Sequence, residues 1–166
     1  VYGGRFFAIP QEIVMKDISK QIDAGATHIS FGDPDFLNGP THSLRLVRKM
    51  HAKFSSVTFD FVSKIEHILK HRTIFPELSQ LGCLFTVSAV ESLSDTVLKV
   101  LEKSHTRADV KEAIAMVHST GISLRPTWLA FTPWTTLGDY LEMLEFIDRH
   151  RLIDHVDPVQ YTIRLL

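Results

Sequence analysis

The sequence predicts an α/β fold: a partial (β/α) TIM-like barrel of about five to six βα units with parallel strands. Three observations lead to this fold class. Runs rich in β-branched and aromatic residues recur at intervals of roughly 25 to 40 residues, the length of one strand plus one helix. Helical segments with start and stop signals separate these runs. Each run also alternates polar with apolar residues, which a sheet buried on both faces does not need.

Composition limits the classes of function. The chain has 166 residues, of which 45% are hydrophobic and 22% charged, so we expect a single domain over residues 1–166. The formal net charge of −1 gives no electrostatic reason to expect a nucleic acid or an anionic membrane as partner. No apolar run reaches the roughly 18 residues that cross a bilayer. The single cysteine, Cys83, excludes an internal disulfide and is consistent with a cytoplasmic protein.

Five strands are predicted, each with one polar face. They span Thr27–Gly32, Val57–Phe61, Cys83–Val90, Ile122–Phe131 and Val156–Leu165. Their polar positions are His28, Ser30, Thr58, Asp60, Thr86, Ser88, Ser123, Arg125, Thr127, Gln160, Thr162 and Arg164. An antiparallel sheet with one wet face would alternate in the same way, but the intervening helices favour parallel crossovers. Because closed βα barrels fill their interior with Val, Ile and Leu, a polar interior indicates a polar ligand.

The predicted helices have recognisable ends. Pro10 opens the first helix, where its missing N–H removes no helical hydrogen bond. Gly25 and Gly121 lie where helices end before a strand, because glycine adopts the left-handed conformation at little cost. Capping boxes are expected at Ser92–Asp95, Thr106–Asp109 and Thr136–Asp139.

Ligands of βα barrels bind at the carboxyl ends of the strands. The residues at these ends are Gly32–Phe36, Phe61–Lys64, Ser88–Glu91, Phe131–Trp134 and Arg164. Arginine within a strand is costly unless it is paired, so Arg125 and Arg164 are expected to face Asp60 in the interior. With Gln160 these three residues form the predicted substrate pocket: Asp60, Arg125, Gln160 and Arg164.

Several segments resemble, in order, the core of radical S-adenosylmethionine enzymes, especially members with a cobalamin-binding domain upstream. These segments are Ile29–Phe36, Val87–Ser92, Val97–Lys103, Gly121–Leu124 and Phe131–Thr136, and the resemblance extends over nearly the whole chain. The resemblance implies a six-unit partial barrel with a 4Fe–4S cluster on a CxxxCxxC loop. It also implies reductive cleavage of S-adenosylmethionine (SAM) to a 5′-deoxyadenosyl radical, and cobalamin as a further cofactor of the parent protein.

The same resemblance suggests cofactor-binding residues. Phe31-Gly32-Asp33-Pro34 stands where these enzymes have a GGEP-like motif that holds the methionyl amino group. Ser88 and Glu91 would lie near the ribose, and Lys103 would face the methionyl carboxylate. Leu129 to Phe131 would contact the adenine.

The sequence departs from this family in one important respect: the three cluster cysteines are absent. We therefore predict no metal ligands in this chain. Sequence similar to Val1–Arg5 follows the cysteine loop in this family, so the chain resembles a core with its first strand and cluster loop missing. Such a fragment would be inactive alone, and its exposed sheet edge would favour self-association. Asp33 in place of glutamate is a milder departure.

Two other classes of function remain open. An ordinary βα-barrel metal-dependent hydrolase or lyase would use His28 and Asp60 with the His67/His71 pair, although these two histidines also flank a buried helical stripe. A non-catalytic binding module would use only the polar cleft. The Asp33–Asp35 segment is also a favourable turn, and Lys103 also suits a solvated helix end. The substrate, a small molecule or a peptide, is not specified by the sequence.

Overall fold

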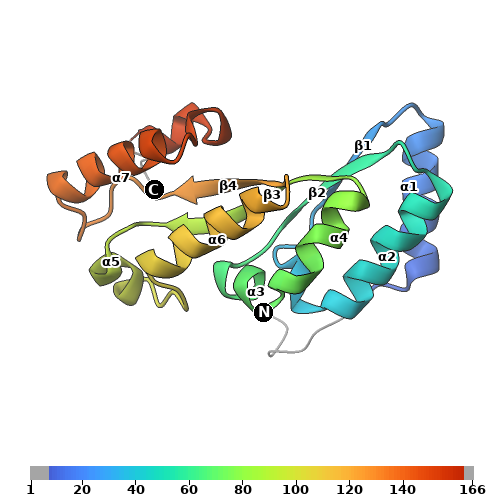
Figure 1. Cartoon of the computed structure of the whole chain (residues 1–166), viewed down its shortest axis with the longest axis horizontal. Helices are drawn as coiled ribbons and strands as arrows, with labels where there is room; N and C mark the ends of the chain where they lie inside the picture. Colours follow the sequence, from blue (N-terminus) through green and yellow to red (C-terminus); the bar gives the residue numbers. More distant parts are fainter. Residues whose placement is uncertain (1–7, 163–166) are drawn as a thin grey trace.

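The computed structural model describes residues 8–162 and contains a four-stranded parallel sheet (Figure 1). The strands are β1 (His28–Phe31), β2 (Thr58–Val62), β3 (Cys83–Glu91) and β4 (Ser123–Trp128). They lie in the order β1-β2-β3-β4, and each neighbouring pair is parallel. The predicted parallel βα arrangement is therefore confirmed over these four strands, and it is consistent with a partial barrel.

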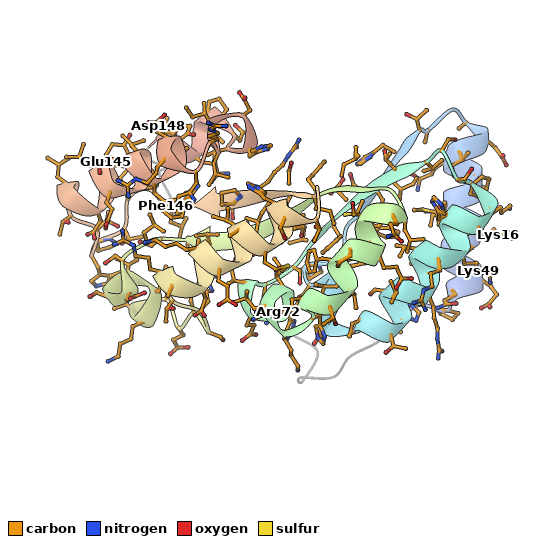
Figure 2. The ribbon with its side chains drawn as sticks, viewed as in Figure 1. Lys16, Lys49, Arg72, Glu145, Phe146 and Asp148 are labelled. Carbon is orange, nitrogen blue, oxygen red and sulfur yellow. The ribbon has the colours of Figure 1, made fainter. Side chains whose placement is uncertain are left out.

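Helices connect the strands and cover the sheet. The α-helices are α1 (Gln11–Asp23), α2 (Pro40–Lys53), α3 (Ile65–Lys70), α4 (Phe75–Gln80), α5 (Asp95–Val100), α6 (Arg107–Ser119) and α7 (Leu137–Arg149). The 3₁₀ turns are η1 (Phe36–Asn38), η2 (Arg72–Ile74), η3 (Ile153–His155) and η4 (Pro158–Tyr161). Phe146 of α7 lies against β4, with its ring edge-on to Trp128 at 6.2 Å between centroids (Figures 1 and 2). Within residues 8–162 no helix is both long and apolar enough to cross a membrane.

Two of the three predicted capping boxes form. Thr106 and Thr136 each accept a hydrogen bond from the backbone N–H three residues later, and Asp109 and Asp139 accept in return from the cap N–H. The hydroxyl of each threonine also donates to its aspartate at 2.7 Å, and this hydrogen bond, followed by the one from the backbone N–H, lowers the pKa of Asp109 and Asp139. At the third site α5 begins at Asp95, and Ser94, rather than Ser92, is its N-cap.

The cap of α6 gives a first testable prediction. Thr106→Ala removes the side-chain acceptor of the Asp109 N–H, so the free energy of unfolding should fall by about 1 kcal/mol. Urea unfolding measures this change. Thr41→Ala, at an exposed position on α2, is the control and should change stability by less than about 0.5 kcal/mol. Equal losses in the two variants would contradict the role of the cap.

The sheet has one covered and one open face, and a bulge changes which residues of β3 lie on each. Asp60 pairs with Phe85 whereas Phe59 pairs with Cys83, so Leu84 is an extra residue in β3. The extra residue reverses the alternation beyond it. Phe85 therefore shares the open face with Asp60, while Thr86 and Ser88 are fully buried on the covered face. The prediction that Thr86 and Ser88 face the interior of the barrel with the other polar positions is wrong.

The predicted fifth strand, Val156–Leu165, does not form within the described residues. Its first part is the turn η4, and Arg164 lies outside the described residues. Asp157 and Pro158 explain the difference, because Pro158 fixes its own φ and Asp157 accepts a hydrogen bond from the Val159 N–H at 3.1 Å. In a fifth strand, a backbone carbonyl would accept a hydrogen bond from an N–H at the outer edge of β4. Here the side-chain oxygen of Gln160 accepts a hydrogen bond from the backbone N–H of Trp128 at 3.0 Å.

Candidate functional site at the carboxyl ends of the strands

The segment after β1 is a turn tied to the end of β2. The exposed Asp33 accepts a hydrogen bond from the Asp35 N–H at 2.8 Å, so the Asp33–Asp35 segment forms a local turn. Asp35 itself is buried and accepts from the Ser63 hydroxyl at 2.9 Å. His67 Nδ1 lies 2.8 Å from Asp35 Oδ2, an ion-pair distance without hydrogen-bond geometry. Gly32, Asp33 and Pro34 are all exposed, so this turn is accessible to a ligand.

Glu91 ends β3 in an unusual backbone conformation. Its φ is +65°, and the Ser92 N–H donates to the Val90 carbonyl at 2.8 Å, which closes a tight three-residue turn around Glu91. The pairing with β4 also shifts here, because Ala89 pairs with Thr127 and Glu91 with Trp128. A left-handed residue that is not glycine costs about 1–3 kcal/mol and is found preferentially at functional sites.

The conformation of Glu91 places its carboxylate beside Lys103. Lys103 Nζ donates to Glu91 Oε1 at 2.8 Å, and both side chains are largely shielded from solvent. Lys103 reaches this position because α5 ends in a Schellman motif: the Lys103 N–H donates to the Leu98 carbonyl at 2.9 Å, with Glu102 at φ +53°. Left-handed residues that are not glycine therefore position both partners of the pair. Lys103 is not a solvated helix-end lysine.

The other expected cofactor contacts lie in different surroundings. Ser88 is fully buried, and its hydroxyl has no hydrogen-bond partner within the described residues, so it does not face the strand ends beside Glu91. Leu129 is half-buried after β4. Phe131 is exposed, and its ring packs on Tyr140 with 4.8 Å between centroids. An exposed aromatic surface is therefore present where the adenine contact is expected.

A hydrogen-bonded cluster occupies the open face near the start of the sheet. Asp60 Oδ2 accepts from the Ser30 hydroxyl at 2.5 Å and lies 2.8 Å from His28 Nε2, while His28 Nδ1 contacts the Thr58 hydroxyl at 2.8 Å. The expected Asp60–Arg125 pair does not form. The physical reason is the position of Phe85 between them on the sheet, where the bulge has placed it.

Arg125 instead stacks on that aromatic ring. Its guanidinium carbon lies 3.7 Å from the centroid of the Phe85 ring. Beside it, a cavity of about 500 Å³ lies between the open face and the η3–η4 segment, lined in part by Arg125 and Gln160. The structure therefore brings together two of the predicted pocket residues. Asp60 lies apart from them, engaged by His28 and Ser30.

The described residues do not fit a metal centre or an iron–sulfur cluster. Within residues 8–162 no three His, Cys, Asp or Glu side chains gather in a way that could hold a metal ion. Cys83 is buried at the start of β3, away from the strand ends, and burial, with Asp60 nearby, strongly raises the pKa of its thiol. His67 and His71 lie 6.1 Å apart between ring centroids, but no further side chain of residues 8–162 completes a metal site with them. This geometry does not support the metal-dependent hydrolase alternative.

Comparisons with known proteins show which fold the chain shares. No family model matches the sequence. Over 75 residues, or 44% of the chain, it is 35% identical to the ribosomal protein uS12 methylthiotransferase RimO of Desulfotalea psychrophila, and the match covers 17% of that protein.

Solved structures extend the likeness to most of the chain. The cobalamin-dependent S-adenosylmethionine radical enzyme OxsB, with aqua-cobalamin and S-adenosylmethionine bound, matches 92% of the chain with a TM-score of 0.68 and 20% identity. The radical S-adenosylmethionine methyltransferase TsrM from Kitasatospora setae, with cobalamin and a 4Fe–4S cluster bound, matches 86% with a TM-score of 0.71 and 12% identity.

These likenesses confirm the resemblance at the level of the fold. The chain has the fold of a core segment of cobalamin-dependent radical SAM enzymes. It spans about a quarter of the length of these solved structures, 24% of OxsB and 27% of TsrM.

Proposed function

We propose that the chain is the SAM-binding core of a cytoplasmic radical SAM enzyme that cleaves SAM reductively to a 5′-deoxyadenosyl radical. The observation that carries this proposal is the Glu91–Lys103 pair at the carboxyl end of β3. A methionyl tail and a ribose need a cation and a hydrogen-bond acceptor at fixed positions. Lys103 keeps two N–H donors for the methionyl carboxylate, and Glu91 keeps one carboxylate oxygen for the ribose hydroxyls.

The remaining parts of the proposed SAM site lie on neighbouring strand ends. The turn of Gly32, Asp33 and Pro34 presents backbone groups and a carboxylate toward the methionyl ammonium. Leu129 and the exposed Phe131 supply an apolar surface for adenine. Because the described residues do not fit a cluster, we propose that its cysteines belong to a longer protein that contains this chain, in which cobalamin is a further cofactor.

The proposal predicts that the 166-residue chain alone binds no 4Fe–4S cluster. One buried thiol cannot replace three thiolate ligands, so anaerobic reconstitution should leave iron below about 0.1 per chain. Iron analysis and the absorption spectrum measure this. A stoichiometric cluster in the isolated chain would contradict the proposal that its cysteines lie elsewhere in a longer protein.

The function itself is tested in the longer protein. After reconstitution and reduction, it should convert SAM to 5′-deoxyadenosine, which liquid chromatography with mass detection measures. Failure to bind SAM in the presence of an intact cluster would instead favour a non-catalytic binding module.

We also propose that the chain self-associates through its sheet edge. Within the described residues no strand pairs with the outer edge of β1, and such an edge favours pairing with another chain. Sedimentation velocity should therefore show a dimer whose fraction rises with protein concentration. Thr27→Lys, which adds a charge beside this edge, should shift the equilibrium toward monomer, whereas Thr41→Lys on α2 should not. A monomer at every concentration would contradict this interface.

A further inference from the structure

We propose that the cavity under the η3–η4 segment binds a small zwitterionic molecule, one with a carboxylate and an ammonium group, such as a free α-amino acid. The cavity has a volume of about 500 Å³, within the range of small-molecule sites. Its lining includes Val87, Arg125, Thr127, Asp154, Asp157 and Gln160. The role of this ligand as the substrate rests on the proposed radical SAM function, whereas its binding rests on the cavity alone.

Arg125 provides the carboxylate-binding side. Its guanidinium is stacked on the Phe85 ring, and within residues 8–162 it makes no hydrogen bond or ion pair. Stacking on an aromatic face fixes the plane of the guanidinium and leaves the N–H donors at its edge free. These donors match a carboxylate in a bidentate arrangement. An arginine that lines a cavity with an aromatic support and no anionic partner is therefore suited to an anionic group of a ligand.

The η3–η4 segment provides the ammonium-binding side. Asp154 and Asp157 both line the cavity from this segment. One oxygen of Asp157 accepts from the Val159 N–H at 3.1 Å, and its other oxygen is not engaged by the described residues. The Asp154 carboxylate has no hydrogen-bond or ion-pair partner in the described part of the chain. Two carboxylates thus lie in one lining with a single guanidinium.

This distribution of charge selects the ligand class. A purely anionic ligand would bind Arg125 but would be repelled by Asp154 and Asp157, and a purely cationic ligand would leave the N–H donors of Arg125 without an acceptor. A zwitterion satisfies both sides. Gln160 uses its oxygen for Trp128 N–H, so its amide N–H₂ group remains as a further donor. Val87 supplies apolar surface for the ligand's side chain.

Ligand-observed NMR with the standard free L-amino acids tests this inference in the purified protein, with and without saturating SAM. At least one amino acid should bind, and its N-acetylated and its carboxamide forms should each bind about 10- to 100-fold more weakly. Arg125→Gln should weaken binding of the free acid by a similar factor, and Arg125→Lys by less. Asp154→Asn should weaken binding of the free acid but not of the N-acetylated form. Arg45→Gln, at an exposed position on α2, is the matched control and should have no effect.

SAM also carries a methionyl zwitterion, so its affinity is measured in the same variants. If Arg125→Gln weakens SAM binding instead of amino-acid binding, the cavity belongs to the methionyl tail and the inference is overturned. Binding of no free amino acid, or equal binding of the blocked forms, overturns it as well. If amino acids bind through Arg125 but SAM is neither bound nor cleaved, the proposed function fails while the cavity assignment stands.

Discussion

Lys103→Ala should weaken SAM binding by about 10- to 100-fold in the cluster-loaded protein, because a charge-assisted hydrogen bond contributes roughly 1.5–3 kcal/mol. Lys103 is the cation of the Glu91–Lys103 pair, and its side chain is 28% exposed. Isothermal titration calorimetry of the reconstituted protein with SAM measures the change. Lys99→Ala, at an exposed lysine in the last turn of α5, is the matched control and should leave the affinity unchanged.

Part of the loss could come from leaving Glu91 without its partner rather than from a missing contact to SAM. The double variant Glu91→Gln/Lys103→Ala separates these effects. If Lys103 contacts SAM directly, the double variant should bind SAM no better than Lys103→Ala. Recovery of wild-type affinity would mean that Lys103 acts only on Glu91, and unchanged affinity in Lys103→Ala would place the methionyl tail elsewhere.

Phe61→Ala should lower the free energy of unfolding by about 3–5 kcal/mol, the typical cost of truncating a fully buried phenylalanine. Phe61 lies in β2, with its ring stacked on Phe36 at 4.9 Å between centroids and 6.4 Å from Phe75. Phe36 directly follows the turn of Asp33–Asp35, so the resulting cavity should also loosen this part of the site. Chemical denaturation measures the stability, and hydrogen exchange of residues 32–38 measures the local effect.

Phe131→Ala is the control for this substitution. Phe131 is 42% exposed, so the loss of stability should stay below about 1 kcal/mol. Phe61→Leu keeps much of the buried volume and should fall between the two. A cost for Phe61→Ala as small as that for Phe131→Ala would show that the packing around β2 has been misplaced.

The repeating part of the fold could be predicted from the sequence. The first four strands lie within a few residues of the alternating segments that predict them, and the Thr106 and Thr136 caps form as expected. These features depend on residues close together in the sequence. The prediction of a fifth strand was wrong. The Val156–Leu165 segment contains both a strand-like alternation and the turn-forming pair Asp157–Pro158, and the structure has a turn there.

The candidate site was only partly predictable, because its contacts join separate strand ends. Glu91 and Lys103 were expected from the resemblance, but their direct pairing depends on two left-handed residues that are not glycine. The Asp35–Ser63 contact was missed, although the two residues follow adjacent strands at the same edge of the sheet. The Arg125–Phe85 stack could not be predicted from the sequence. Phe85 is apolar, so the alternation places it on the covered face, and only the bulge turns it toward the open face.

The extra residue at Leu84 has a consequence for the relatives of this protein. Leu84 has no partner on β2, because Phe59 pairs with Cys83 and Asp60 with Phe85. A homologue that lacks this residue would keep both pairings as a regular strand, and Phe85 would still support Arg125 on the open face. A deletion beyond Phe85 would instead exchange the two faces for the later residues of β3. Position 84 is therefore a place where the length of the chain can change by one residue without altering the ligand-facing surface.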